Sequence, residues 1–469
     1  MARAKPKTVF VCSNCGNDTP RWEGRCPSCG EWNTLAAHRQ EKERTVASWT
    51  GLASVPAQEL AQVEVDEQPR RPFASQEVNR VLGGGIVPGS VVLIAGDPGI
   101  GKSTLLLRLA GDIAETVGET LYVSGEESIS QIKMRADRLG VSGRHLMLLQ
   151  TTSLSDMVDQ LNKTSPALVV VDSIQTMQDD TVESAPGSVF QIRECTRTLV
   201  QWAKAQAVPI VLAGHVTKGG DIAGPRVLEH MVDAVLYMEG DPISSWRLLR
   251  AVKNRFGTTN EIGVFEMTES GLIEVDDPSA TFLSERQEGA VGSVIIATLE
   301  GSRPMLVEVQ ALTNPSVLPA PRRVATGIDF NRLLLVCAVL TRRAGISLAD
   351  QDVIVNVTGG LRVSEPAADL GMALAIASSY RNAPVARGSA AVGEIGLSGE
   401  VRRVPQLSRR LVEAGRLGLQ QCLVPATRND GVNGPDGLAA TPVATLRQAV
   451  SAVLGSRAGT SSAVYADLV

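Results

Sequence analysis

The stretch LGGGIVPGSVVLIAGDPGIGKST, residues 82–104, decides how the rest of the chain is interpreted. Within it an aliphatic run, Val91–Ala95, leads into Gly96–Thr104, which matches the pattern GxxxxGK followed by Ser or Thr at every fixed position. A glycine-rich loop between a strand and a helix is the setting of a phosphate-binding P-loop. The helix is indicated by apolar residues that recur every four positions: Leu105, Leu109, Ile113 and Val117.

The residue types of this loop suit the binding of ATP. Glycines let backbone N–H groups curl around phosphate oxygens, and the helix N-terminus adds its partial positive charge. We expect Lys102 to reach the β and γ oxygens and the Ser103 hydroxyl to bind Mg²⁺. The whole run is predicted to contact the nucleotide: Gly96, Asp97, Pro98, Gly99, Ile100, Gly101, Lys102, Ser103 and Thr104.

Further aliphatic runs follow the P-loop and are typical of buried strands: Thr120–Ser124, Ala167–Asp172, Pro209–Gly214 and Ala234–Glu239. Helical patterns alternate with these runs from about residue 71 to 285, which predicts an α/β domain with a doubly wound parallel sheet. Only 3% of the residues are aromatic, so the cores must consist mainly of aliphatic side chains.

Carboxylates at the ends of two of these strands complete the predicted nucleotide site. Asp172 ends an aliphatic strand, where a Walker B aspartate would hold Mg²⁺. Glu126 and Glu127 follow the strand 120–124, and we select Glu126 as the catalytic carboxylate that polarises the attacking water. His215 follows the strand 209–214, and two roles stay open for it: a sensor of the γ-phosphate or a structural residue.

Four cysteines near the N-terminus form two CxxC pairs, Cys12 with Cys15 and Cys26 with Cys29. Two such pairs supply the four thiolates of a closed tetrahedral zinc site, which leaves no open position for catalysis. A redox-active pair is the weaker alternative. A segment this short needs a metal in order to fold, so residues 1–32 are predicted to be a C4 zinc finger.

Composition limits the remaining possibilities. A chain of 469 residues favours two or three domains, and its net charge of −5 means that nucleic-acid contacts must come from local basic patches. No apolar stretch is long enough for a membrane span and no signal peptide is recognisable, which predicts a soluble cytoplasmic protein. Residues 33–70 are interpreted as a linker, 286–456 as a second α/β domain and 457–469 as a tail.

The motifs in combination resemble a known family. Residues 82–104 resemble the RecA and KaiC ATPases, and KNRFG at Lys253–Gly257 narrows the resemblance to the RadA (Sms) family of bacterial DNA repair proteins. In that family a four-cysteine finger precedes a RecA-like P-loop ATPase core, and a Lon-protease-like α/β domain follows it. The resemblance covers nearly the whole chain.

This resemblance implies a hexameric ring of identical subunits that binds single-stranded and branched DNA. The ring would hydrolyse ATP and drive branch migration beside the RecA recombinase. Lys253 and Arg255 would then be catalytic in trans, because each would reach the γ-phosphate held by a neighbouring subunit. Without the resemblance, they would be interpreted as a basic pair on the surface at a strand end.

Two loops are candidates for contact with DNA. Asp179–Ser188 and Lys218–Arg226 contain glycine and proline, and in RecA-like rings such loops face the central channel. Lys218 and Arg226 are predicted to contact phosphates of the DNA. Ordinary surface loops are the alternative interpretation of both segments.

The C-terminal domain resembles Lon protease but lacks its catalytic dyad. Ala367, in PAADLGMALAIASS, stands at the position of the Lon nucleophile, and Ser408, in GEIGLSGEVRRVPQLSRRL, stands at that of the catalytic lysine. Alanine offers no nucleophile and arginine cannot act as a base, so a non-proteolytic scaffold is predicted. Paired arginines indicate either a DNA-binding face or solvated helix surfaces: Arg322, Arg323, Arg342, Arg343, Arg402, Arg403, Arg409 and Arg410.

Two other functions compete with a DNA-dependent ATPase. A KaiC-like signalling ATPase would never touch nucleic acid, and both KNRFG and the cysteine pairs argue against it. An ATP-driven protease would need the hydroxyl that Ala367 lacks. The favoured function requires ATP, Mg²⁺ and Zn²⁺.

Overall fold

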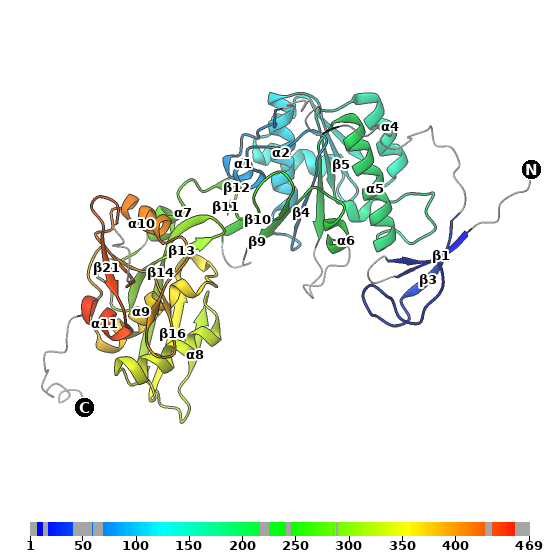
Figure 1. Ribbon diagram of the computed structural model, residues 1–469. Helices are drawn as coiled ribbons and strands as arrows, with labels where there is room; N and C mark the ends of the chain where they lie inside the picture. The colour runs from blue at the N-terminus through cyan, green and yellow to red at the C-terminus, as the bar shows by residue number, and fades with distance from the viewer. Residues whose placement is uncertain are drawn as a thin grey trace, which may run out of the picture. The chain divides into compact units, whose positions relative to one another are not determined.

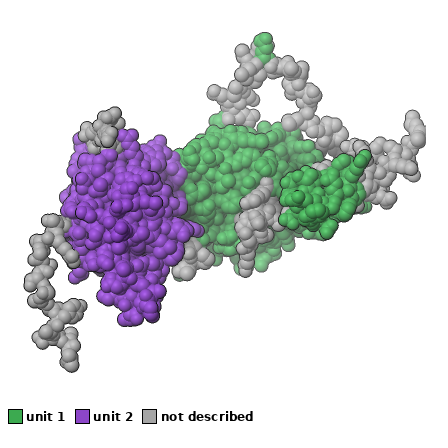
Figure 2. Space-filling model, turned by 60° about the horizontal axis from the view of Figure 1, so that its bottom comes forward, with its two compact units in different colours: residues 1–275 green, residues 276–469 purple. Residues whose placement is uncertain are grey.

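The computed structural model describes residues 7–12, 17–40, 59, 69–215, 225–240, 245–284, 286–287, 289–426 and 434–454. The chain divides into two compact units, Met1–Val275 and Asp276–Val469, which are green and purple in Figure 2. The boundary predicted from the sequence lies between residues 285 and 286 instead. The difference arises because helix α7 (Pro278–Leu283) packs within the second unit, where Ser279 Oγ donates to Glu413 Oε1 and accepts from the Leu306 N–H.

A small antiparallel sheet in the order β2-β1-β3 forms the N-terminal module of the first unit. Its strands are β1 (Lys7–Cys12), β2 (Asp18–Thr19) and β3 (Leu35–Gln40). β3 lies in the stretch interpreted from the sequence as a linker, but it pairs with β1 along its whole length. The module therefore extends beyond residue 32, because the ladder satisfies the backbone groups of both strands.

A nine-stranded sheet forms the centre of the predicted ATPase core, in the order β12-β11-β10-β9-β4-β8-β7-β5-β6. Figure 1 labels β4, β5 and β9 to β12 of this sheet. The strands from β9 to β6 in this order are parallel, and β10, β11 and β12 continue the sheet in antiparallel fashion. The strands are β4 (Val91–Gly96), β5 (Thr120–Ser124), β6 (Leu146–Gln150), β7 (Leu168–Asp172), β8 (Ile210–His215), β9 (Ala234–Glu239), β10 (Trp246–Asn254), β11 (Ile262–Thr268) and β12 (Gly271–Glu274).

Helices cover both faces of this sheet because successive strand residues point to opposite sides. Val92 and Ile94 of β4 belong to the hydrophobic cluster of one face, whereas Val91 and Leu93 belong to that of the other. One face is covered by α1 (Gln76–Leu82), α2 (Lys102–Thr116) and α3 (Ile129–Leu139). The other is covered by α4 (Leu154–Thr164) and α5 (Val189–Gln206), and α6 (Pro225–Glu229) precedes β9.

The predicted doubly wound parallel sheet is confirmed, and β4, β5, β7, β8 and β9 coincide with the five predicted strands to within a residue at each end. The predicted inner face of α2 is correct for Leu105, Leu109 and Ile113, which are buried. It is wrong for Val117, which is exposed because it caps the C-terminus of the helix. No helix in the described ranges is long and apolar enough to span a membrane.

The second unit contains a seven-stranded mixed sheet in the order β15-β16-β14-β13-β17-β20-β21 and a two-stranded ribbon of β18 and β19. Its strands are β13 (Ser293–Glu300), β14 (Arg303–Pro315), β15 (Arg323–Thr326), β16 (Gln351–Val357), β17 (Ser389–Ala391), β18 (Glu394–Ile395), β19 (Val401–Arg402), β20 (Gln421–Pro425) and β21 (Ala439–Val443). Besides α7, its helices are α8 (Phe330–Val339), α9 (Asp369–Arg381), α10 (Leu407–Arg416) and α11 (Leu446–Leu454). The predicted hairpin is β13 with β14, and the second α/β domain is confirmed.

Candidate functional site

The P-loop connects the carboxyl end of β4 to the first turn of α2. Gly101 precedes the helix with φ of +114°, and a Cβ there would lie 2.7 Å from Met267 Cε. At Gly96 a Cβ would lie 2.5 Å from the Met238 carbonyl oxygen, so both positions require glycine. The start of α2 has no side-chain cap, which leaves its first N–H groups available to an anion.

Lys102 is the buried cation of this loop. Its Nζ donates to the carbonyl oxygens of Gly96 and Asp97, each at 2.8 Å, and thus lies against the backbone that would surround phosphates. Burial lowers the pKa of Lys102, while the carboxylates of Asp172, Asp97 and Glu126 raise it. Ser103 follows in the first turn and is half-buried. This arrangement can bind a polyphosphate together with a divalent cation.

Asp172 ends β7 and is buried, and its carboxylate is held in place by a tyrosine. The Tyr122 hydroxyl, on the neighbouring strand β5, donates to Asp172 Oδ2 at 2.7 Å. The pKa of Tyr122 lies well above its ordinary value because the ring is buried and because Asp172 is negative. Sequence reasoning missed Tyr122, although a hydroxyl-bearing residue within an apolar strand is a recognisable signal for a buried polar contact.

The two neighbouring glutamates after β5 make different contacts. Glu126 Oε1 accepts hydrogen bonds from Ser173 Oγ and pairs with His215 Nε2 at 3.1 Å. These contacts, the one with His215 foremost, lower the pKa of Glu126 to about 2. Glu127 instead forms an ion pair with Arg135. The structure therefore places Glu126 next to Ser173, the residue that follows Asp172, and leaves Glu127 in a separate pair. Sequence reasoning missed the contact with Ser173.

His215 lies at the end of β8, level with Gly96 of β4. Within the part of the chain that the structure describes, its Nδ1 is buried without a hydrogen-bond partner, and so is Oε1 of Gln175, whose amide Nε2 donates to the His215 carbonyl at 3.5 Å. The contact with Glu126 links His215 to the nucleotide site, and its sequence neighbour Val216 begins a stretch outside the described residues.

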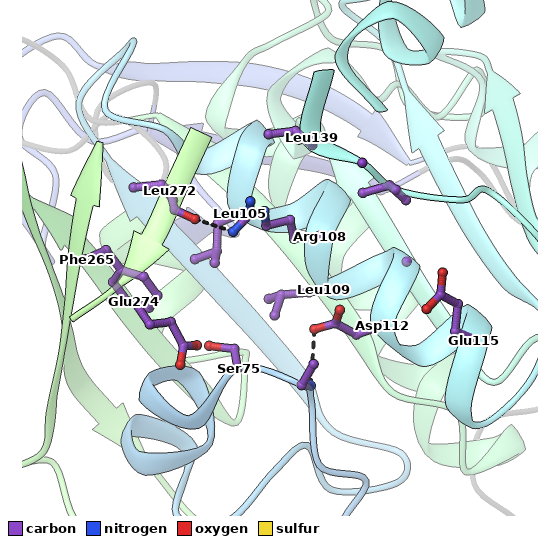
Figure 3. A pocket seen from close by; sticks show the side chains of 14 residues that line it. Ser75, Leu105, Arg108, Leu109, Asp112, Glu115, Leu139, Phe265, Leu272 and Glu274 are labelled. Atoms are coloured by element: carbon purple, nitrogen blue, oxygen red, sulfur yellow. Dashed lines mark hydrogen bonds between the residues drawn. The ribbon is translucent and has the colours of Figure 1, made fainter. Parts of the chain in front are cut away.

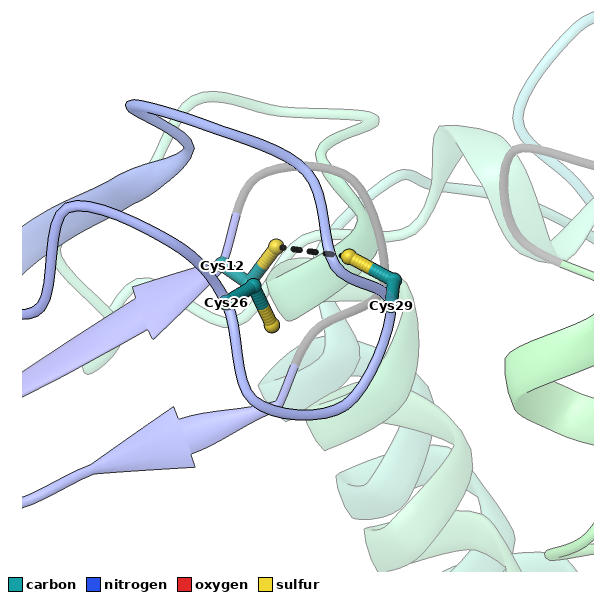
Figure 4. Close-up of side chains that lie close together, drawn as sticks. All are labelled: Cys12, Cys26 and Cys29. Atoms are coloured by element: carbon teal, nitrogen blue, oxygen red, sulfur yellow. Dashed lines mark hydrogen bonds between the residues drawn. The ribbon is translucent and has the colours of Figure 1, made fainter.

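Three of the four predicted zinc ligands lie together (Figure 4). The sulfur atoms of Cys12, Cys26 and Cys29 are within 4.8 Å of one another, and Cys12 Sγ lies 3.7 Å from Cys29 Sγ. Thiolates on one tetrahedral Zn²⁺ at about 2.3 Å would be separated by roughly 3.8 Å, so the spacing fits zinc. Cys15, the fourth predicted ligand, lies outside the described residues.

Lys253 and Arg255 lie at the edge of the sheet opposite the P-loop. In the register of the sheet, Lys253 is level with Val235, near the start of β9, whereas Gly96 is level with Met238, near its end. Lys253 Nζ donates to the carbonyl oxygens of Glu229 and Val232, at 2.6 and 2.9 Å.

Arg255 Nη1 contacts the Oδ1 of Asp233 at 3.0 Å, and about half of the Arg255 side chain is exposed. Asp233 itself is buried and its Oδ2 accepts the Val91 N–H. The structure thus does not bring Lys253 and Arg255 to the P-loop of their own chain.

The other predicted site residues are located as follows. Lys218 lies outside the described residues, and Arg226 belongs to α6. Ala367 is buried in a short turn before α9, and Ser408 is exposed on α10. Near them Arg410 is fully buried and makes a two-point ion pair with Glu365, with both N–O distances 2.6 Å. This contact was not anticipated from the sequence.

A separate pocket of about 310 Å³ is lined by α2, by the segment before α1, by the end of α3 and by β11 and β12 (Figure 3). None of residues 96–104 lines it. Asp112 accepts the Ala74 N–H there, and burial raises the pKa of its carboxyl group. Glu274 accepts the Gln76 N–H at 3.0 Å, and Arg108 donates to the Leu272 carbonyl. These polar contacts hold the segment before α1 against α2 and β12.

Comparison with known proteins agrees with this geometry. An AAA domain family matches residues 55–221, a rubredoxin metal binding domain matches residues 10–37, and the family of subunit ChlI of Mg-chelatase matches residues 311–428. The core is therefore an ATPase domain that uses ATP with Mg²⁺, and the N-terminal module is a zinc ribbon.

Relatives that match over nearly their whole length share one name, DNA repair protein RadA. The chain is 49% identical over 455 residues to the DNA repair protein RadA of Halalkalibacterium halodurans and 48% identical over 456 residues to that of Bacillus subtilis, covering 96% of this chain and 100% of each relative. It is 50% identical over 452 residues to the DNA repair protein RadA of Pseudomonas aeruginosa, covering 96% of this chain and 99% of the relative. The chain belongs to the RadA family of DNA repair proteins, and its core is an ATPase of the RecA-like type.

Proposed function

We propose that the chain is a DNA-dependent ATPase of homologous recombination that binds single-stranded DNA and drives branch migration of branched intermediates beside the RecA recombinase. It works as a ring of identical subunits, six in number, in the cytoplasm. One observation supports assembly into a ring: Lys253 and Arg255 lie at the edge of the sheet opposite the P-loop. A cation pair in that place meets bound ATP only when a second subunit supplies the nucleotide.

Within one subunit, the residues of the nucleotide site have three tasks. Lys102 and the N–H groups of the loop bind the phosphates. Lys102 is a buried cation, and the N–H groups at the start of α2 have no side-chain cap. Ser103 and Asp172 hold Mg²⁺, which neutralises charge on the β and γ oxygens when bound. Glu126 orients the attacking water. Its pKa of about 2 keeps it a carboxylate, and Ser173 and His215 fix its direction.

Between subunits, Lys253 and Arg255 act in trans on the neighbour's γ-phosphate. Both cations are already oriented by the chain that carries them, through carbonyl oxygens for Lys253 and through Asp233 for Arg255. A preorganised cation stabilises charge that develops in the transition state without reorganisation during the reaction. ATP hydrolysis thereby depends on assembly of the ring.

DNA contact in this proposal comes from the loops that follow β7 and β8. Lys218 and Arg226 bind phosphates of the backbone, and the ring channel brings the loops of all subunits to one strand. The second unit is a scaffold without peptidase activity, because the buried Ala367 has no nucleophilic group.

The test is the ATPase rate of the full chain with and without single-stranded DNA, in the absence and the presence of RecA. We expect DNA to raise the rate, and Lys102→Ala to abolish it, because the phosphates lose their main cation. An ATPase indifferent to DNA would favour the KaiC-like signalling role instead. Full turnover in Lys102→Ala would contradict the assignment of the nucleotide site.

A further inference from the structure

Two tryptophan side chains are exposed next to each other on the zinc ribbon. Trp22 is 56% exposed and Trp32 is 67% exposed. A Cβ at Gly24 would lie 3.8 Å from Trp22 Cη2 and 3.6 Å from Trp32 Cζ3, so both rings flank this glycine. The described core of the module uses neither ring and consists of Cys12, Cys26 and Leu35, packed by Phe10 and Cys29. Core packing therefore does not explain why these rings are present.

Both rings are held in place by neighbouring groups. The indole Nε1 of Trp22 donates to the Leu35 carbonyl at 3.2 Å. Trp32 pairs with Arg25 across a β-bridge, and the guanidinium carbon of Arg25 lies 5.9 Å from the centre of the Trp32 ring. Arg25 Nε in turn donates to the Gly30 carbonyl at 2.7 Å. A ligand that stacks on these rings therefore loses little affinity to the ordering of side chains, because both rings are already fixed.

We propose that Trp22, Trp32 and Arg25 form a stacking platform for the bases of single-stranded nucleic acid. Indole faces stack on any base, so such a platform binds without sequence preference, and a guanidinium over an indole adds a cation–π contribution. The platform rests on the proposed function, in which the chain acts on single-stranded DNA. It assigns part of that binding to the zinc ribbon.

The surroundings of the rings favour bases over a protein partner. Protein hot spots lie in desolvated pockets within a packed interface, and the described side chains around these rings form no such apolar surround. Among the residues of the module whose side-chain burial is described, Trp22 and Trp32 are the only large apolar side chains that are exposed. Exposed polar residues flank them: Arg21, Glu23, Glu31 and Asn33.

The charges near the platform also predict how it binds. Among the described side chains next to the rings, Arg21 and Arg25 are balanced by Glu23 and Glu31, which leaves no net charge in this group. Stacking, rather than attraction to phosphates, then supplies its affinity. Loss of the rings should weaken binding at every salt concentration without changing the slope of affinity against salt, since that slope counts neutralised phosphates.

The experiment uses the full zinc-loaded chain and a fluorescently labelled oligothymidylate, with binding followed by anisotropy over a range of salt concentrations. The double variant Trp22→Leu with Trp32→Leu keeps apolar side chains but removes both aromatic faces. We expect its affinity to fall about five-fold or more for each ring lost, with the salt slope unchanged. The matched control, Trp22→Phe with Trp32→Phe, retains aromatic faces and should bind within about three-fold of the original protein.

Zinc content and unstimulated ATPase rate show whether each variant is intact. Should the double leucine variant lose zinc, Trp32→Leu alone is the test, because Trp32 is the more exposed ring. Unchanged oligonucleotide affinity in an intact leucine variant would overturn the platform while leaving the proposed function standing. Unchanged affinity combined with lost repair in cells would overturn it in favour of a protein-binding surface. Failure of the original protein to bind the oligonucleotide would overturn the proposed function itself.

Discussion

Replacement of Arg255 by alanine tests whether the KNRFG segment acts within its own subunit or on its neighbour. Lys253 and Gly96 are level with Val235 and Met238, respectively, and β9 lies between the strands that carry them. Three residues along a strand and two strand spacings separate the two backbones by roughly 14 Å. The phosphate-binding loop extends further from that edge, so a distance of about 15 Å or more separates Arg255 from nucleotide in the same chain.

The magnitude distinguishes the two possibilities. At about 15 Å in water, two unit charges interact by roughly 0.3 kcal/mol, and salt reduces this further. Action in cis therefore predicts less than about a two-fold change in ATP binding or hydrolysis. Removal of a trans-acting arginine finger lowers the hydrolysis rate by about 10³–10⁵-fold while ATP binding stays nearly intact. A smaller loss of hydrolysis with branch migration abolished would indicate coupling of nucleotide state to DNA movement.

The assay mixes two inactive proteins, Lys102→Ala and Arg255→Ala, and measures DNA-stimulated ATP hydrolysis. In randomly assembled rings, one half of the P-loops and one half of the fingers are intact, so roughly a quarter of the interfaces contain both. We expect recovery of about that fraction of the activity. Mixed rings that demonstrably form yet recover no activity would refute the trans arrangement. Arg255→Lys, which keeps the charge, is the matched control for loss of the cation.

Four further changes have defined outcomes. Tyr122→Phe removes the hydrogen bond to Asp172, so the Mg²⁺ concentration for half-maximal ATPase activity should rise by up to about ten-fold. An unchanged Mg²⁺ concentration for half-maximal activity would show that Tyr122 does not position Asp172. Glu126→Gln should lower kcat while ATP binding is retained. Because the pKa of Glu126 is lowered to about 2, this carboxylate remains ionised at all higher pH values. A fall in kcat between pH 8 and pH 5 that occurs in the original protein but not in this variant would contradict that pKa. Cys12→Ser should release zinc and unfold the ribbon while the ATPase core keeps its thermal transition, which metal analysis and calorimetry can measure, and a fully zinc-loaded variant would contradict the ligand assignment. Arg410→Met leaves a carboxylate without its buried partner and should destabilise the second unit by about 3–5 kcal/mol in chemical denaturation, so a change below about 1 kcal/mol would count against an essential ion pair.

The sequence by itself determined the features that depend on neighbouring residues. The P-loop was recognisable because its glycines, lysine and serine are contiguous, and their geometry follows from a strand that turns directly into a helix. The buried parallel strands were recognisable as continuous aliphatic runs. The strands β6 and β10 were not predicted. Leu146–Leu149 of β6 do form an apolar run, but this strand lies at the edge of the sheet and is only partly buried. In β10 charged residues interrupt the apolar ones and burial alternates along the strand.

Only the tertiary structure decided which distant residues meet and which stay apart. Tyr122 meets Asp172 because β5 and β7 are neighbours in the sheet, although they are not consecutive in the chain. Lys253 lies away from the P-loop because β10 runs antiparallel to β9. The end of β10 that carries Lys253 is therefore level with the start of β9, at the edge opposite the P-loop. Strand order and direction arise from packing over the whole domain, and local periodicity in the sequence does not encode them.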